Sequence, residues 1–184
     1  TDIHESREEL KQANGFGGKT VLSSIGFLSQ GKGLEYSLEG FSKSKRDNSV
    51  YLIAGETHPD VKRIDGEYSD KLEELSQEFG LKTTRTDKLG DMQDSDVVIF
   101  NKFLTNDEIF RLMKMSDIGM VTSLGREQIS SGSLAYWIGM GRAVIATEFP
   151  YAKDMEHEGV GHFVRFEDPD AIAREIDYLT SDED

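Results

Sequence analysis

The chain has 184 residues, of which 36% are hydrophobic and 30% charged, the composition of an ordinary globular protein with one domain. It contains no cysteine, which excludes disulfide scaffolds, cysteine-ligated zinc and thiol catalysis. Its formal net charge of −14 argues against duplex nucleic acid or an anionic membrane surface as the main partner.

Neither a targeting signal nor a membrane span is apparent. The uncharged stretches are too short and too polar to cross a bilayer, and the first residues, TDIHESREEL, lack the apolar core of a signal peptide. We therefore expect a cytoplasmic protein. Residues 1–18 predict a short polar helix followed by glycines, so we expect them to be peripheral and residues 19–184 to form the domain.

Apolar runs alternate with amphipathic stretches along the whole chain. Short apolar runs predict strands at residues 19–26, 49–55, 97–100, 118–121 and 143–147. Helical spacing predicts helices at residues 33–43, 67–79, 106–115, 132–140 and 168–179. End signals agree with two of them, because Thr105 is suited to cap a helix that starts at 106 and Gly80 to end one at 79.

Strands that are apolar on both faces and separated by helices are typical of a parallel sheet. The sequence therefore predicts the α/β class, with a doubly wound, Rossmann-like parallel sheet of about six strands and helices on both faces. In such a sheet, ligands bind beyond the carboxyl ends of the strands. The loops that follow strands are therefore the candidate sites.

The first such loop, GFLSQGKG at residues 26–33, has features of a phosphate site. Gly26, Gly31 and Gly33 let the backbone approach a ligand closely, and the next helix points its amino terminus at the loop. Lys32 adds a positive charge. The loop nearly fits the P-loop pattern, but Gly33 stands where a Ser or Thr would hold Mg²⁺. The alternative is a plain turn with a solvated lysine.

A second loop, REQISSGSL at residues 126–134, lies between a strand and an apolar helix. Ser130, Ser131 and Gly132 place small side chains and backbone N–H groups at the helix amino terminus, which favours an anion. A simple helix cap would explain the same residues. Two such loops at one edge of a sheet favour a diphosphate ligand.

Other chemistry finds little support in the sequence. The four histidines lack the spacing of a zinc helix. No G-x-S-x-G elbow is present, so a serine hydrolase is not indicated. We expect no metal site and no cofactor apart from the substrate.

Five stretches together resemble a known family. They are VLSSIGFLSQGKGLEYSLEGF (21–41), YLIAGETHPD (51–60), FLTNDEIFRLMKMSDIGMVTS (103–123), QISSGSLAYWIGMGRAVIAT (128–147) and GHFVRFEDPDAIAREI (161–176). Between residues 19 and 179 the chain resembles the C-terminal, nucleotide-sugar-binding domain of retaining GT-B glycosyltransferases of the group 1 type, family 4. The order and spacing match that family's lysine–glycine loop, donor loop and terminal helix.

The resemblance implies transfer of a sugar, of the hexosyl type, from a nucleotide-diphosphate sugar to an acceptor with retention and without a tightly bound metal. The loop with Lys32 would hold the diphosphate, and the turn at residues 101–104 would meet the nucleobase. The implied donor-binding residues are Gly26, Gly31, Lys32, Gly33, Ser130, Ser131, Gly132, Tyr136 and Lys102.

Some positions depart from the family's pattern. Phe27 stands where many members carry an arginine, which leaves Lys32 as the principal cation. Gln128 and Tyr136 stand where the family has two glutamates spaced eight apart, with Glu127 one residue earlier. The resemblance makes Gln128 or Glu127 the donor-sugar contact and Tyr136 the ribose contact. Gln128 and Tyr136 can form hydrogen bonds with sugar hydroxyls, but neither brings a carboxylate.

The family's N-terminal, acceptor-binding domain has no counterpart in this chain. We therefore expect the domain to fold and bind a nucleotide sugar but not to transfer sugar alone. Two alternatives stay open at this point. One is a P-loop-like nucleotide hydrolase, and the other is a non-catalytic doubly wound nucleotide-binding or regulatory module.

Overall fold

The computed structural model describes residues 4–45, 48–90, 92, 94–157 and 160–181. Within these residues, seven strands form one sheet in the order β3-β4-β2-β1-β5-β6-β7, and every pair of neighbours is parallel. The strands are β1 (Thr20–Ile25), β2 (Ser49–Ala54), β3 (Thr83–Thr86), β4 (Val97–Phe100), β5 (Ile118–Val121), β6 (Ala143–Thr147) and β7 (His162–Val164).

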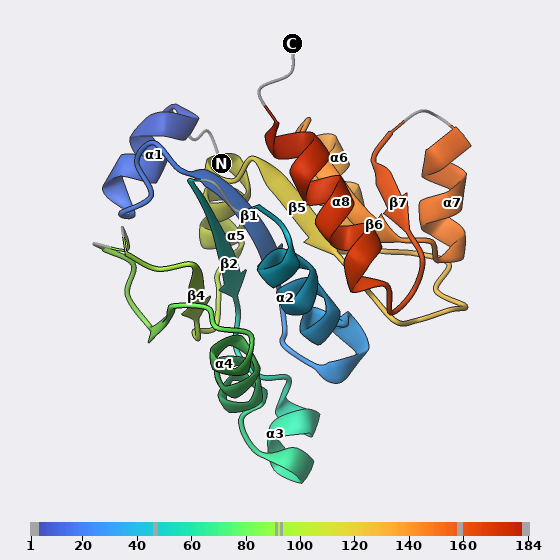
Figure 1. The fold of residues 1–184 in the computed structure, drawn as a ribbon, viewed down its shortest axis with the longest axis horizontal. Coiled ribbons are helices and arrows are strands. Elements are labelled where there is room, and N and C mark those ends of the chain that lie inside the picture. The colour runs from blue at the N-terminus through green and yellow to red at the C-terminus, as the bar shows by residue number, and fades with distance from the viewer. Residues whose placement is uncertain (1–3, 46–47, 91, 93, 158–159, 182–184) are drawn as a thin grey trace.

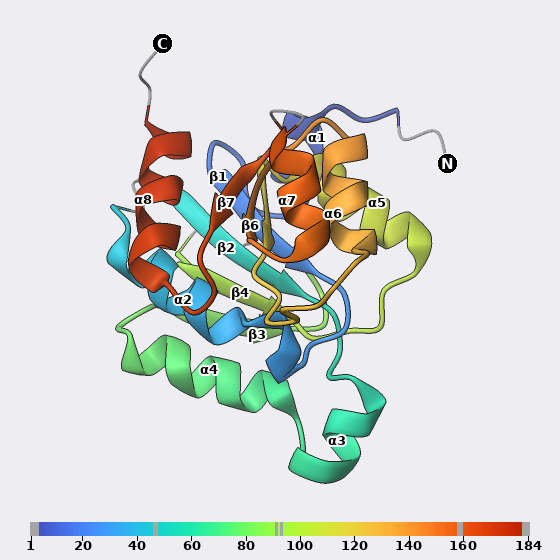
Figure 2. The same ribbon diagram turned by 90° about the vertical axis from the view of Figure 1, so that its right-hand side faces the viewer.

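Helices cover both faces of the sheet, as Figure 2 shows. One face carries α2 (Leu34–Lys43), α4 (Tyr68–Glu78) and α8 (Pro169–Thr180), whose apolar residues pack in one buried cluster. The other carries α1 (Arg7–Ala13), α5 (Asn106–Met115), α6 (Gly132–Gly139) and α7 (Pro150–His157), which pack in a second cluster. The short helices η1 (Gln30–Lys32) and α3 (Pro59–Asp65) lie in loops that follow strands. The predicted doubly wound fold is confirmed.

The order of the strands sets where a ligand can bind. From β1 the chain passes to β2 and then to the edge strand β3, and comes back between these two as β4. It then crosses to the opposite side of β1 as β5 (Figure 1). The boundary between the paired strands β1 and β5 is therefore the topological switch point of the sheet. Open α/β sheets bind ligands at such a point, beyond the carboxyl ends of the strands.

In the described residues the sheet has one strand more than the expected six or so, and two α-helices, α3 and α7, were not anticipated. The strands absent from the prediction, β3 and β7, are the two edge strands. All four residues of β3, Thr-Thr-Arg-Thr, are only partly buried, so no apolar run marks it. The seven-residue helix α3 has no buried residue, and only Val61 packs partly against the core, so no strong apolar pattern marks it. α7 was also missed.

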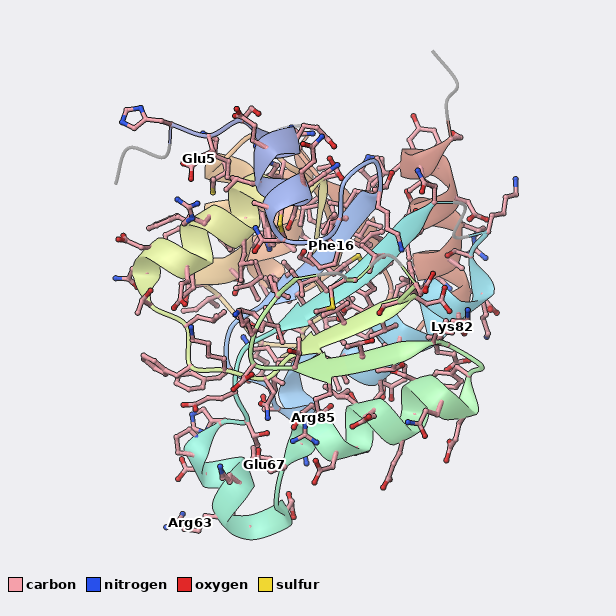
Figure 3. The ribbon with its side chains drawn as sticks, turned by 90° about the vertical axis from the view of Figure 1, so that its left-hand side faces the viewer. Glu5, Phe16, Arg63, Glu67, Lys82 and Arg85 are labelled. Atoms are coloured by element: carbon pink, nitrogen blue, oxygen red, sulfur yellow. The ribbon has the colours of Figure 1, made fainter. Side chains whose placement is uncertain are left out.

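The described part of residues 1–18 is less peripheral than expected. Ser6 and Glu9 form a capping box at the start of α1. Leu10 and Phe16 are fully buried in the cluster beneath α5, and Figure 3 shows Phe16 under α1 facing the sheet. The ammonium group of Lys11 lies 2.6 Å from the carboxylate of Asp117, which precedes β5. These contacts attach the segment to the core.

No described helix combines the length and apolar character that crossing a membrane would require.

Candidate functional site

A cavity of about 420 Å³ lies at the switch point between β1 and β5. Its walls come from the end of β1, the loop after it, the end of β5 and the loop before α6. The lining residues are Ser24, Ile25, Gly26, Phe27, Leu28, Lys32, Leu34, Met120, Val121, Thr122, Ser123, Gln128, Ser131 and Ser133. Both loops singled out in the sequence thus meet in one cavity.

The glycine loop, residues 26–33, carries the cation of this cavity. Gly26 has φ of 130° and Gly33 has φ of 61°, conformations that favour glycine. Among the described residues, no acid or other group bonds the ammonium of Lys32. Although Lys32 is exposed overall, loss of water around its ammonium group lowers the pKa of Lys32 from its usual range. An unpaired, partly desolvated cation favours an anionic ligand.

The glycine loop is bonded to the end of β5. The N–H of Leu124 donates to the carbonyl of Gly31 at 2.9 Å, and the hydroxyl of Thr122 donates to the carbonyl of Lys32 at 3.0 Å. A Cβ at Gly33 would lie 2.3 Å from the carbonyl oxygen of Thr122. Only glycine fits there, so the Ser or Thr that a P-loop needs at this position has no room.

The serine loop, residues 124–131, forms the opposite wall. Ser131 is buried and caps α6, since its hydroxyl accepts a 3.2 Å hydrogen bond from the N–H of Leu134. The amide of Gln128 accepts from the hydroxyl of Ser123 and donates to the carbonyl of Ser130. Ser131 and Gln128 line the cavity. The amino terminus of α6 is therefore held at its edge.

A smaller apolar cavity of about 310 Å³ adjoins the first, because both are lined by Gly26 and Phe27. Its other lining residues are Gly55, Glu56, Phe103, Leu104 and Ile109. Phe27 and Phe103 are 42% and 60% exposed, and their ring centroids lie 6.4 Å apart. Two exposed aromatic rings beside an apolar cavity form a surface on which a flat ring can stack.

Some of the predicted residues lie elsewhere. The ammonium of Lys102 lies 2.5 Å from the carboxylate of Glu108 and lines a separate cavity of about 670 Å³. Tyr136 packs edge-on against Phe110, with ring centroids 5.6 Å apart. Neither lines the two cavities described above, because each side chain has a partner on α5.

The remaining predicted residues differ in their position. Ser130, Gly132, Gly31 and Glu127 are exposed at the loops around the larger cavity but are not among the residues that line it.

The sequence reasoning missed several lining residues. Thr122 and Ser123 come directly after the predicted strand at 118–121, and that position could have marked them as candidates. Phe27 and Phe103 were noted only as a departure and as part of a turn. Their pairing joins loops after β1 and β4, and no local pattern indicates it.

In the described part of the chain, no group of three or more His, Asp or Glu side chains is arranged to hold a metal ion. That the protein works without a bound metal ion stays a prediction.

Comparison with known proteins decides the family. The sequence signature of the family described as "Glycosyl transferases group 1" matches residues 6–184. The chain belongs to the group 1 glycosyltransferase family. No curated protein matches this group 1 chain significantly by sequence.

Solved structures with the same fold include other glycosyltransferases. The chain is similar to Anabaena Alr3699/HepE in complex with UDP and glucose, with a TM-score of 0.78 and 16% identity, covering 98% of this chain and 44% of HepE. It is similar to the C-terminal domain of the group 1 family protein LpcC from Francisella tularensis, with a TM-score of 0.73, 20% identity and coverage of 97% and 84%. A third is the catalytic domain of cholesterol-α-glucosyltransferase from Helicobacter pylori, with a TM-score of 0.61, 14% identity and coverage of 87% and 85%.

At these identities the likeness shows the fold of a GT-B glycosyltransferase domain. The group 1 chain spans less than half the length of HepE.

Proposed function

We propose that this chain is the donor-binding domain of a retaining glycosyltransferase of the hexosyl type, which uses a nucleotide-diphosphate sugar. One observation carries the proposal. The glycine loop and the serine loop converge on a single cavity that contains the ammonium group of Lys32 and the amino terminus of α6. These groups suit a diphosphate, because backbone N–H groups and a cation stabilise phosphate oxygens.

The two adjoining cavities suggest how the donor lies. The diphosphate fits the larger cavity, beside Lys32 and Ser131. The nucleobase fits the apolar cavity beside Phe103 and Leu104, and the solved structure of HepE with UDP and glucose supports a nucleotide of this kind. The sugar then extends toward the serine loop near Glu127.

The same groups can assist the reaction. When the sugar departs, negative charge develops on the nucleoside diphosphate, and a fixed cation with oriented N–H groups stabilises that charge. Lys32 can do this without a metal ion, so we propose metal-independent binding. Transfer then requires an acceptor-binding domain outside this chain, and the isolated domain is expected to be inactive. The cytoplasmic location stays a prediction.

Titration calorimetry tests the proposal. The chain is titrated with UDP, GDP and ADP, each with and without Mg²⁺. Binding of at least one diphosphate that does not depend on metal supports a donor site. A strict need for Mg²⁺ would support the nucleotide hydrolase instead, and no binding of any nucleotide would support a non-catalytic regulatory module whose glycine loop is only a turn. Retention is tested separately on a form of the protein that transfers sugar, from the anomeric configuration of its product.

A further inference from the structure

The side chain of Gln128 is bonded at both ends inside its own loop. Its Oε1 accepts a hydrogen bond of 2.6 Å from the hydroxyl of Ser123, and its Nε2 donates one of 2.8 Å to the carbonyl of Ser130. Its backbone N–H donates at 2.9 Å to the carbonyl of Gly125. One amide thus joins the end of β5 to the residue just before Ser131, the cap of α6.

Packing against Gly125 holds this side chain in place as well. A Cβ at Gly125 would lie 3.2 Å from Oε1 and 3.3 Å from Cβ of Gln128, which is tighter than an ordinary contact. The side chain of Gln128 is therefore folded back over the turn that precedes it. Gly125 does not have a positive φ, so its backbone conformation does not require glycine. The lack of a side chain at this position instead allows Gln128 to approach closely.

Further bonds link the same loop to the rest of the cavity. The carbonyl of Ser123 accepts a 2.5 Å hydrogen bond from the hydroxyl of Thr147 on β6, and the N–H of Leu124 is bonded to Gly31 of the glycine loop. Through Ser123, the amide of Gln128 is connected to both. The two hydrogen bonds of the Gln128 side chain therefore help to set the conformation of the cavity wall that carries Ser131.

We infer that Gln128 is a positioning residue, which holds the serine loop in its nucleotide-binding shape before a ligand arrives, and not a group that binds the donor sugar. This inference rests on the proposed function for its ligand. It assigns to Gln128 a role different from the sugar contact that the sequence indicated. The amide acts on the diphosphate through Ser131 and the amino terminus of α6.

The substitution Gln128→Glu separates the two roles. A carboxylate can still accept the hydrogen bond from Ser123, but it has no donor for the carbonyl of Ser130, and two oxygens would face each other. A positioning role therefore predicts weaker binding of UDP and UDP-glucose alike. The added negative charge repels the diphosphate of both ligands, so the comparison between them decides. If Gln128 bound the sugar, a carboxylate would still accept from sugar hydroxyls, and UDP-glucose would lose less affinity than UDP.

Calorimetry with UDP and with UDP-glucose gives the first measurement. We expect Gln128→Glu to raise both dissociation constants by the same factor, at least about fivefold, from one lost hydrogen bond and the added charge. Gly125→Ala, which presses on Gln128 without straining the backbone, should shift both constants in the same direction. Ile129→Ala is the matched control in the same loop, because Ile129 is 83% exposed and does not line the cavity.

Hydrogen exchange of the free protein gives the second measurement and needs no nucleotide. The amides of residues 124–131 should exchange faster in Gln128→Glu and Gly125→Ala than in the wild type or Ile129→Ala. Unchanged exchange, or a smaller loss of affinity for UDP-glucose than for UDP in Gln128→Glu, would overturn the inference. If the wild type binds neither nucleotide, the proposed function fails, while the exchange rates still decide whether Gln128 orders the loop.

Discussion

Replacing Lys32 by methionine should have opposite effects on ligand binding and on the stability of the free protein. Methionine keeps an apolar stem of similar length and removes the ammonium group. That group has no bonded partner among the described residues, so it is free to serve a diphosphate. Losing one charged hydrogen bond costs about 1.5 to 3 kcal/mol, which raises the dissociation constant between about 10-fold and about 150-fold.

The free protein should become more stable in the same variant. Loss of water lowers the pKa of Lys32 below its ordinary value of 10.5. The folded protein therefore holds this proton less tightly than the unfolded chain does, and the charged lysine destabilises the fold at neutral pH. As the pH rises toward 10.5 the lysine loses its charge in the folded state, so the stability difference between the variant and the wild type should shrink.

Thermal unfolding with and without UDP measures both effects. Without nucleotide, Lys32→Met should unfold at a higher temperature than the wild type. Added UDP should raise the unfolding temperature of the variant less than that of the wild type. Lys82→Met is the control, since Lys82 is exposed at the opposite end of the strands, before β3 (Figure 3). The reasoning is refuted if Lys32→Met binds UDP as tightly as the wild type, or if its free form is less stable while the Lys82 control is unaffected.

Three further results are expected. Gly119→Ala should destabilise the protein by about 1 to 3 kcal/mol in urea unfolding, because its Cβ would lie 2.4 Å from the fully buried ring of Trp137; a neutral effect would show that the ring can move. Hydrogen bonds from Lys102 and Thr105 lower the pKa of Glu108 to about 2. The free energy of unfolding of the wild type should therefore exceed that of Glu108→Gln at neutral pH, and this difference should disappear as the pH falls from 4.5 toward 2. A constant difference across that range would contradict this. Phe103→Ala should weaken UDP but leave inorganic pyrophosphate unaffected in calorimetry, since stacking of a base contributes about 1 to 3 kcal/mol; equal losses would place the base elsewhere.

The parts of the fold with strong local patterns were predictable. The predicted ranges 97–100, 106–115, 118–121 and 143–147 coincide with β4, α5, β5 and β6. The strands β4 and β5 are fully buried, so their apolar runs stand out. The helix α5 begins at a capping box formed by Thr105 and Glu108. Edge strands β3 and β7 pair on one side only, and such strands can be short or polar without a visible pattern.

The candidate site divides in the same way. Lys32, the glycines around it and the serines before α6 belong to short local patterns, so the sequence alone selected them. The partners of Lys102 and Tyr136 on α5, however, depend on how helices pack across the sheet, and a pattern within one loop carries no information about them.

By itself, the sequence determined the alternation of strands and helices, the glycine positions and the presence of two loops suited to anions, because each depends on residues close together in the chain. Only the tertiary structure decided that β1 and β5 are neighbours, that the two loops face one cavity, and that Gln128 is occupied within its own loop. The first two features depend on strand order and on contacts between residues distant in the sequence, which are set when the whole core packs. The partners of Gln128 are near it in the sequence, but the loop conformation that brings them together is held by contacts with Gly31 and Thr147, which are distant.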